Sequence, residues 1–165
     1  MAALSAAFMI GSLFPYLTYG IPALASLFIM VAVIESGVLW GFASFVVSAL
    51  LVLILPGDPE AKLMYIAILG YYPVLKAVLE TKCRRAIEIP IKYIIFNIAL
   101  VVAYSLIAGL IGVELGDMNE FGKYTALIMI VLANAVFTIY DIMIARMSVW
   151  YSVRLHKAVM RIFNK

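Results

Sequence analysis

The chain has 165 residues, of which 67% are apolar and 13% are charged, and its net charge is +3 at pH 7. Soluble globular proteins are roughly 45–50% apolar, and a fold this small cannot hide so much more apolar surface from water. The composition therefore excludes a soluble enzyme, a secreted disulfide scaffold and a nucleic-acid binder, and it makes membrane lipid the solvent of the fold. The single cysteine, Cys83, excludes an intramolecular disulfide framework.

Continuous apolar runs, separated by Gly, Pro and acidic residues, predict about six transmembrane helices, since one crossing needs about 20 apolar residues. In chain order they cover about 1–19, 23–34, 38–55, 61–79, 90–113 and 124–145. The second run is short for a crossing, so it is either a re-entrant or a tightly packed segment. A membrane barrel would alternate apolar and polar residues, which these runs do not. The expected fold class is an all-α integral membrane protein.

The basic residues predict the orientation of these helices. Ten of the twelve Lys and Arg residues lie around Cys83 or after the sixth helix, namely Lys76, Lys82, Arg84, Arg85, Lys92, Arg146, Arg154, Lys157, Arg161 and Lys165. The positive-inside rule places both regions in the cytoplasm, and six crossings place the N-terminus there as well. A signal peptide is the alternative for the first segment, and the absence of a positively charged start argues against it.

The last residues predict a separate element, so we divide the chain into a transmembrane bundle at 1–148 and a basic cytoplasmic tail at 149–165. In the tail, apolar residues recur at helical spacing between the basic ones: Leu155, Val159, Ile162 and Phe163. This pattern predicts an amphipathic helix on the surface of an anionic leaflet. A topology signal without a partner is the alternative.

The side-chain chemistry predicts no enzyme. His156 is the only histidine and lies in the basic tail, so neither a His-pair metal motif nor a Ser-His pair at membrane depth can form. No Gly-rich phosphate loop follows a strand, so any ATP hydrolysis must take place on other proteins. The sequence therefore predicts no catalytic residue, no metal and no cofactor.

Small residues form a stripe on the first expected helix. Ala3, Ala7 and Gly11 follow one another at four-residue spacing, with Ala2 and Ala6 beside them. Small side chains at this spacing let two helix backbones approach closely in lipid. The stripe is either a docking surface for a partner membrane protein or an internal packing surface.

Polar residues within the expected helices should face the bundle interior, because a polar group facing lipid is costly. Those expected to bind a substrate, mostly in the outer half, are Tyr65, Tyr104, Ser105, Tyr124, Thr125 and Asn134. In the inner half, we expect Lys76 to form a structural ion pair with Asp141 or Glu35.

The architecture resembles the substrate-binding S component of energy-coupling factor (ECF) vitamin transporters. The resemblance rests on six hydrophobic helices in under 200 residues, on both ends lying inside, and on Ala-x-x-x-Ala spacing in the first helix, where Ala2 precedes Ala6 and Ala3 precedes Ala7. It implies a bacterial, multi-pass protein of the cytoplasmic membrane that captures a vitamin-like small molecule from outside. It also implies transfer of that molecule to a transmembrane scaffold protein driven by two cytoplasmic ATPases.

Two other classes of membrane protein compete with this interpretation. One is a membrane scaffold or accessory protein that binds no ligand. The other is a small channel or an ion-coupled carrier, which would need paired charges at the bilayer midplane or an inverted repeat. The sequence shows neither of these two features.

Overall fold

The computed structural model describes residues 1–14, 18, 20–111 and 120–155, and it describes no side chains in 107–126 or at 155. Every regular element in these ranges is helical. In chain order the elements are α1 (Ala2–Met9), a 3₁₀ turn η1 (Ile10–Leu13), α2 (Gly20–Ser36), α3 (Val38–Ile54), α4 (Pro59–Met64), a π turn η2 (Tyr65–Leu69), α5 (Tyr72–Lys82), α6 (Arg85–Ile111), α7 (Glu120–Trp150) and a π turn η3 (Tyr151–Leu155).

Within the described residues, three helical stretches are long and apolar enough to cross a membrane: Pro59–Lys82, Arg85–Leu106 and Leu127–Arg154. The remaining three apolar helices are shorter, at Ala2–Leu13, Gly20–Ser36 and Val38–Ile54. The last three of the six expected helices thus reach the length of a crossing, and the first three are shorter than about 20 residues within the described part of the chain. The first helix is only about 18 Å long at 1.5 Å per residue, against about 30 Å of hydrocarbon.

Several element boundaries also differ from the expected ones. The second helix begins at Gly20 and includes Pro22, which lies in its first turn, where a proline leaves no hydrogen bond unmade. Pro90 lies inside α6 rather than at its start. Because proline has no backbone N–H, the carbonyl of Ala86, four residues earlier, loses its helical hydrogen bond. Ala86 is exposed and lies at the start of α6.

The division between a bundle at 1–148 and a tail at 149–165 falls within a continuous helix. α7 runs to Trp150, and the π turn carries the helical backbone on to Leu155. The rest of the tail, including Val159, Ile162 and Phe163, lies outside the described residues.

The turns of the N-terminal half follow from local chemistry. Gly37, with φ +88°, joins α2 to α3 in a conformation that side-chain-bearing residues rarely adopt. Asp58 caps α4 by accepting a hydrogen bond from the backbone N–H of Glu60 at 2.9 Å, and Pro59 occupies the first helical turn. A Cβ added at Gly41 would overlap Val33, so this glycine lets α2 and α3 pack closely.

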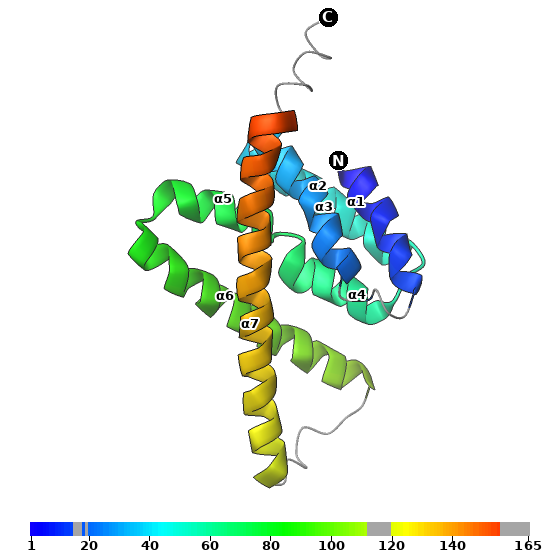
Figure 1. The fold of residues 1–165 in the computed structure, drawn as a ribbon. Helices are drawn as coiled ribbons and strands as arrows, with labels where there is room; N and C mark the ends of the chain where they lie inside the picture. The colour runs from blue at the N-terminus through cyan, green and yellow to red at the C-terminus, as the bar shows by residue number, and fades with distance from the viewer. Residues whose placement is uncertain (15–17, 19, 112–119, 156–165) are drawn as a thin grey trace, which may run out of the picture.

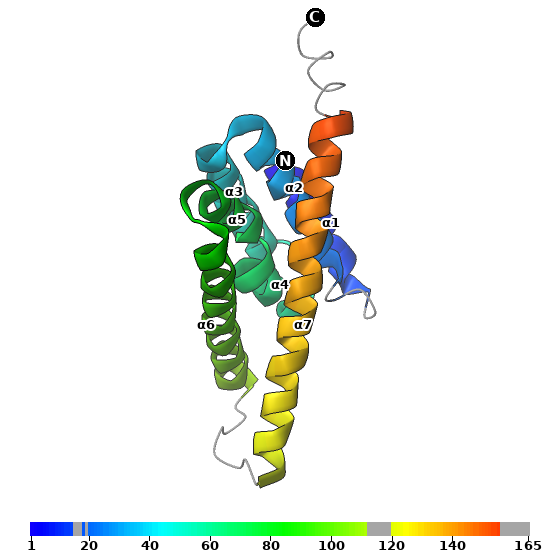
Figure 2. The same cartoon turned by 60° about the vertical axis from the view of Figure 1, so that its left-hand side comes forward.

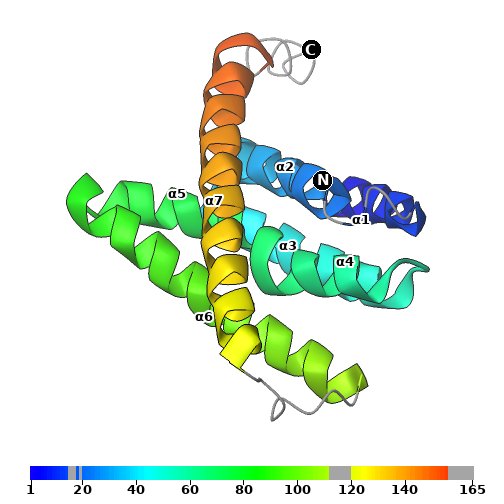
Figure 3. The ribbon, with the colours of Figure 1, turned by 60° about the horizontal axis from the view of Figure 1, so that its bottom comes forward.

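The helices form two packed groups around α7. Helices α1 to α4 gather on one side of α7, and the elbow made by α5 and α6 lies on the other (Figure 3). The long α7 extends beyond the other helices at its Glu120 end (Figure 1). The N-terminus and the C-terminal end of α7 lie toward the same end of the molecule (Figure 2), which is compatible with the expected orientation but does not test it.

Two hydrophobic clusters hold these groups together. One joins α1, α2, α3 and η2 around the fully buried Tyr65. The other joins α2, η2, α5, α6 and α7, with the rings of Phe96 and Phe137 stacked at 4.2 Å between their centroids. Much apolar surface remains exposed outside these clusters, including Leu39 on α3 and Ile139 on α7. In a membrane this surface faces lipid.

Candidate functional site

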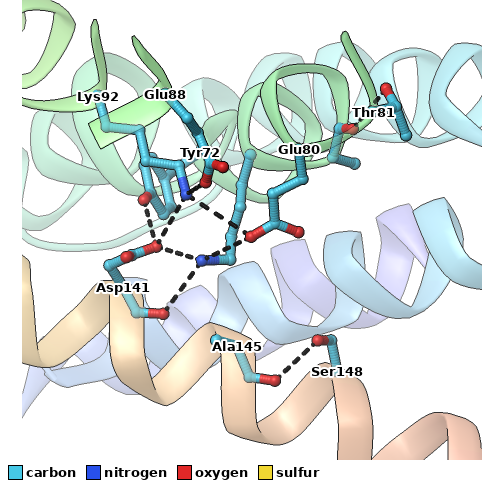
Figure 4. Close-up of polar contacts among 10 residues, drawn as sticks. Tyr72, Glu80, Thr81, Glu88, Lys92, Asp141, Ala145 and Ser148 are labelled. Atoms are coloured by element: carbon cyan, nitrogen blue, oxygen red, sulfur yellow. Dashed lines mark hydrogen bonds and ion pairs between the residues drawn. The ribbon is translucent and has the colours of Figure 1, made fainter. Parts of the chain in front are cut away.

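Five charged residues from three helices meet beside the elbow between α5 and α6, and we call them the charged cluster (Figure 4). They are Lys76, Glu80, Glu88, Lys92 and Asp141. Four-residue spacing puts the α5 pair on one helix face and the α6 pair on another. Because only two residues separate α5 from α6, the two faces come together, and α7 supplies the aspartate.

Lys76 joins α5 to α7. Its ammonium group pairs with Oδ1 of Asp141 and lies 3.1 Å from Oε1 of Glu80. It also donates to the backbone oxygen of Asp141 at 3.4 Å. The hydroxyl of Tyr72 donates to the same Oδ1 at 2.6 Å, so α5 binds this carboxylate through two side chains.

Lys92 joins α6 to the other two helices. Its ammonium group pairs with Glu88 one turn earlier. It also lies 3.6 Å from Oε1 of Glu80 and 3.6 Å from Oδ1 of Asp141. Two cations and three carboxylates therefore form one network that connects α5, α6 and α7.

The burial of these groups is uneven. Lys76 is 5% exposed and Lys92 is 4% exposed, whereas the side chain of Glu80 is 48% exposed. An unpaired charge in such surroundings is expensive, so each buried ammonium group needs its carboxylates in place. The network consequently fixes how the three helices sit against one another.

A hollow of about 660 Å³ opens beside the charged cluster and is lined by all five of its residues. Cys83, Arg85, Arg146 and Ser148 also line it, together with apolar side chains of α6 and α7. This volume lies in the range of small-molecule sites, about 300–1,000 Å³. We call it the charged hollow.

Two guanidinium groups on the wall of the charged hollow have no acidic partner. Arg85 and Arg146 are exposed, and within the described residues neither forms an ion pair. A guanidinium group presents parallel N–H donors that match a carboxylate or a phosphate. The hollow can therefore receive a small anionic group without displacing the existing pairs.

Of the two carboxylates expected to pair with Lys76, Asp141 makes the contact. Glu35 lies at the end of α2 and accepts a hydrogen bond from the hydroxyl of Tyr151 at 2.8 Å. It connects α2 to the end of α7 rather than to α5.

Tyr65, expected to bind substrate, has a different place in the structure. It is fully buried, and its hydroxyl is hydrogen bonded to Ser5 and Ser48, both at 2.7 Å. Since Ser5 also donates to the carbonyl of Ala25 at 2.8 Å, this hydroxyl network connects four helical segments. Tyr65 is not accessible to a ligand in this arrangement, because helices cover it on every side.

The other expected substrate residues are not brought together. Tyr104 is 52% exposed, and Ser105 donates to the carbonyl of Val101 on its own helix at 2.8 Å. Asn134 exchanges two hydrogen bonds with Asn97, at 2.9 and 3.0 Å, which connects α6 to α7. None of these residues lines the charged hollow. Tyr124 and Thr125 lie on α7, but their side chains are outside the described part of the chain.

The expected docking stripe divides into two parts. Ala6 is buried and Gly11 is half-buried, with Ile21 of α2 at 3.2 Å from where a Cβ would lie. Ala3 and Ala7 are exposed, and Ala2 is half-buried. Ala6 and Ala7 lie about 100° apart around α1, so one faces the bundle while the other is exposed, and the 3₁₀ turn adds about 20° per residue before Gly11.

Glu80, Glu88 and Lys92 were not predicted as site residues, and Lys92 served only as an indicator of orientation. Their four-residue spacings, Lys76 to Glu80 and Glu88 to Lys92, were the available signal. That signal predicts pairs within each helix. The sharing of carboxylates between the helices depends on the α5–α6 elbow.

Comparisons of the chain with protein families, curated proteins and solved structures found no match. The residues that the structure describes also contain no group of three or more His, Cys, Asp and Glu side chains placed to hold a metal ion. The function is therefore inferred from the geometry of the charged hollow.

Proposed function

We propose that this chain is the membrane-embedded substrate-capture subunit of a small-molecule uptake transporter, and that its substrate occupies the charged hollow. The observation that carries the proposal is a hollow of about 660 Å³ with two unpaired guanidinium groups on its wall. A hollow beside the span-length helices is where a membrane protein would hold a polar solute away from lipid. The ECF-like architecture expected from the sequence supports the same function.

The chemistry of the wall favours a small solute with a carboxylate or phosphate group. Arg85 and Arg146 would bind that group, and the exposed carboxylate of Glu80 would accept hydrogen bonds from donors elsewhere on the solute. The buried lysines would not bind it directly, because their carboxylate partners already hold them.

The depth of the site favours a role in transfer to a partner. Asp141 lies about 8 Å along α7 from Arg146, toward the basic C-terminal end of the helix. The positive-inside rule makes this the cytoplasmic half. The hollow is therefore suited to the release of a solute, through a scaffold protein driven by cytoplasmic ATPases.

Native mass spectrometry of the full chain, gently extracted from cells, tests the proposal. We expect the chain to retain a non-lipid small molecule. Arg85→Gln should weaken its retention roughly tenfold or more, because a charge-assisted hydrogen bond contributes about 1.5–3 kcal/mol. Arg84→Gln is the matched control, since Arg84 is an exposed neighbouring cation that does not line the hollow.

Two results would contradict the proposal. One is an extracted chain that carries only lipid even when cells are grown in rich medium. The other is equal retention of the small molecule by the Arg84 and Arg85 variants.

A scaffold or accessory protein without a ligand is the second candidate, and one observation favours it. Among the described residues, every buried side-chain nitrogen and oxygen already has a hydrogen-bond partner. Exposed apolar residues on α3, such as Leu39 and Ile54, would then contact another membrane protein. In that case the chain copurifies with a protein partner and carries no small molecule.

A further inference from the structure

The C-terminal end of α7 carries an exposed surface made of two arginines, a tryptophan and apolar residues. Arg146, Trp150 and Arg154 line it together with Val149 and Val153, and they surround a shallow hollow of about 530 Å³. Both valines are more than 60% exposed and Trp150 is 49% exposed. We call this surface the basic-aromatic face.

The π turn aligns the two arginines. In a regular α-helix, eight residues at about 100° each would leave Arg154 rotated by about 80° from Arg146. A π turn holds more residues per turn, so each residue from Tyr151 to Leu155 rotates the chain by less. This returns Arg154 to the side of the helix that carries Arg146 and Trp150.

The opposite side of the same turn is anchored to the rest of the protein. Tyr151 is 8% exposed, and its hydroxyl donates to Oε1 of Glu35 at the end of α2. This contact fixes the rotation of the helix end. The basic-aromatic face is therefore held pointing outward from the bundle.

The position along α7 places this face at a membrane surface. The apolar run of α7 ends just before Arg146, which places this residue close to a membrane boundary. Arg154 lies about 12 Å beyond Arg146, among the headgroups. Tryptophan is enriched at this boundary, which agrees with the place of Trp150.

Within the described part of the chain, the charges of this face lack an acidic partner. Among the described residues, neither Arg146 nor Arg154 forms an ion pair. The geometry points to a phosphate anion as the missing partner, because guanidinium groups bind phosphate through paired hydrogen bonds. A phospholipid supplies both the phosphate and the acyl chains that would cover Val149 and Val153.

We therefore propose that the basic-aromatic face is a binding site for an anionic phospholipid of the leaflet at the basic end of the protein. Arg146 and Arg154 bind the headgroup phosphate, Trp150 lies at the level of the glycerol, and an acyl chain covers the valines. This site shares Arg146 with the charged hollow, whereas Trp150 and Arg154 line only the basic-aromatic face, and lipid binding there does not require the transporter function proposed above.

Fluorescence quenching by brominated lipids tests the site. The chain has two tryptophans, Trp40 and Trp150, so the exposed Trp40 is first replaced by Phe to leave Trp150 as the only reporter. The full chain is reconstituted in phosphatidylcholine vesicles that contain brominated phosphatidylglycerol or, separately, brominated phosphatidylcholine. We expect phosphatidylglycerol to quench Trp150 at a lower mole fraction, with a preference of roughly fivefold for each arginine.

Paired variants in the Trp40→Phe background distinguish this site from general charge attraction. Arg146→Gln with Arg154→Gln should abolish the preference. Lys82→Gln with Arg84→Gln removes the same charge from exposed positions at the end of α5 and should preserve it. Equal quenching by the two lipids, a preference that survives loss of both arginines, or an equal loss in both double variants would each overturn the proposal.

Discussion

The N-terminal helices and the two long C-terminal helices use different chemical groups for their buried polar contacts. In the first region, α1, α2 and α3 with η2, buried polar side chains are hydroxyl groups centred on Tyr65. In the second region, α6 and α7 contact each other through amides and, with α5, through the charged cluster. The first region is held by close packing around hydroxyl groups, and the second by amide and charged contacts between its helices.

The three span-length stretches differ in how much of each is buried. Half of the apolar window in Pro59–Lys82 is buried, against 22% in Arg85–Leu106 and 17% in Leu127–Arg154. Hydroxyl groups are small enough to fit between closely packed helices, where a charged side chain would not. Long helices surrounded mainly by lipid have no hydrophobic drive to associate, so polar groups contribute more to their contact.

The largest effect is expected in the charged cluster. Lys76→Met should lower the free energy of unfolding by about 3 kcal/mol, because it leaves Asp141 with Tyr72 and the more distant Lys92 as partners. Lys76→Met combined with Asp141→Leu should cost less than the two single changes added together. The measurement is unfolding of the purified chain by a denaturing detergent.

The double variant is the control for this interaction. If the effects of Lys76→Met and Asp141→Leu add without a coupling term, the two side chains do not stabilise each other, and the second region is not held by its charges.

A smaller effect is expected on the first helix, where neighbouring alanines differ in burial. Ala6→Trp should destabilise the protein by about 1–3 kcal/mol, because Ala6 is 1% exposed and the new ring overfills the first region. Ala7→Trp should leave unfolding within about 0.5 kcal/mol of the unsubstituted chain, because Ala7 is exposed.

Copurification with native membrane partners adds a second readout to this pair. If Ala3 and Ala7 form a docking surface, Ala7→Trp should lose the partner while its melting temperature stays unchanged. An Ala7→Trp variant that melts normally and keeps every partner would exclude docking at this position.

The smallest effect is expected from Tyr65→Phe, at about 1 kcal/mol. The change removes the hydroxyl that connects Ser5 and Ser48, but each serine keeps a backbone carbonyl partner. Thermal unfolding of the variant checks this value. A cost larger than that of Lys76→Met would reverse the comparison and make the hydroxyl network the stronger of the two.

Helical class and apolar character were predictable from the sequence, because both are local properties. Continuous apolar runs give helices wherever the backbone must satisfy its own hydrogen bonds in lipid. The turn at Pro56-Gly57-Asp58-Pro59 follows from capping chemistry and is where the structure has it. The three span-length helices also correspond to the last three expected runs.

In the first half of the chain, the first expected run, 1–19, differs most from the structure, which describes a helix over Ala2–Leu13, because hydropathy alone does not report where a helix ends. The first run continues apolar beyond Leu13, yet the helix closes in a 3₁₀ turn there and leaves Gly11 against Ile21. The point at which the first helix closes in a 3₁₀ turn depends on its contacts with α2.

Composition and spacing determined by themselves that this protein is helical, with helices apolar and long enough to cross a membrane, and that Lys76 needs a carboxylate. Only the tertiary structure decided which charged groups share an ion-pair partner, because Glu80, Lys92 and Asp141 come from three helices that meet at one elbow. The same holds for the arginines of the basic-aromatic face, which a π turn aligns. Helix periodicity is a local property, whereas the meeting of helices depends on the packing of the whole chain.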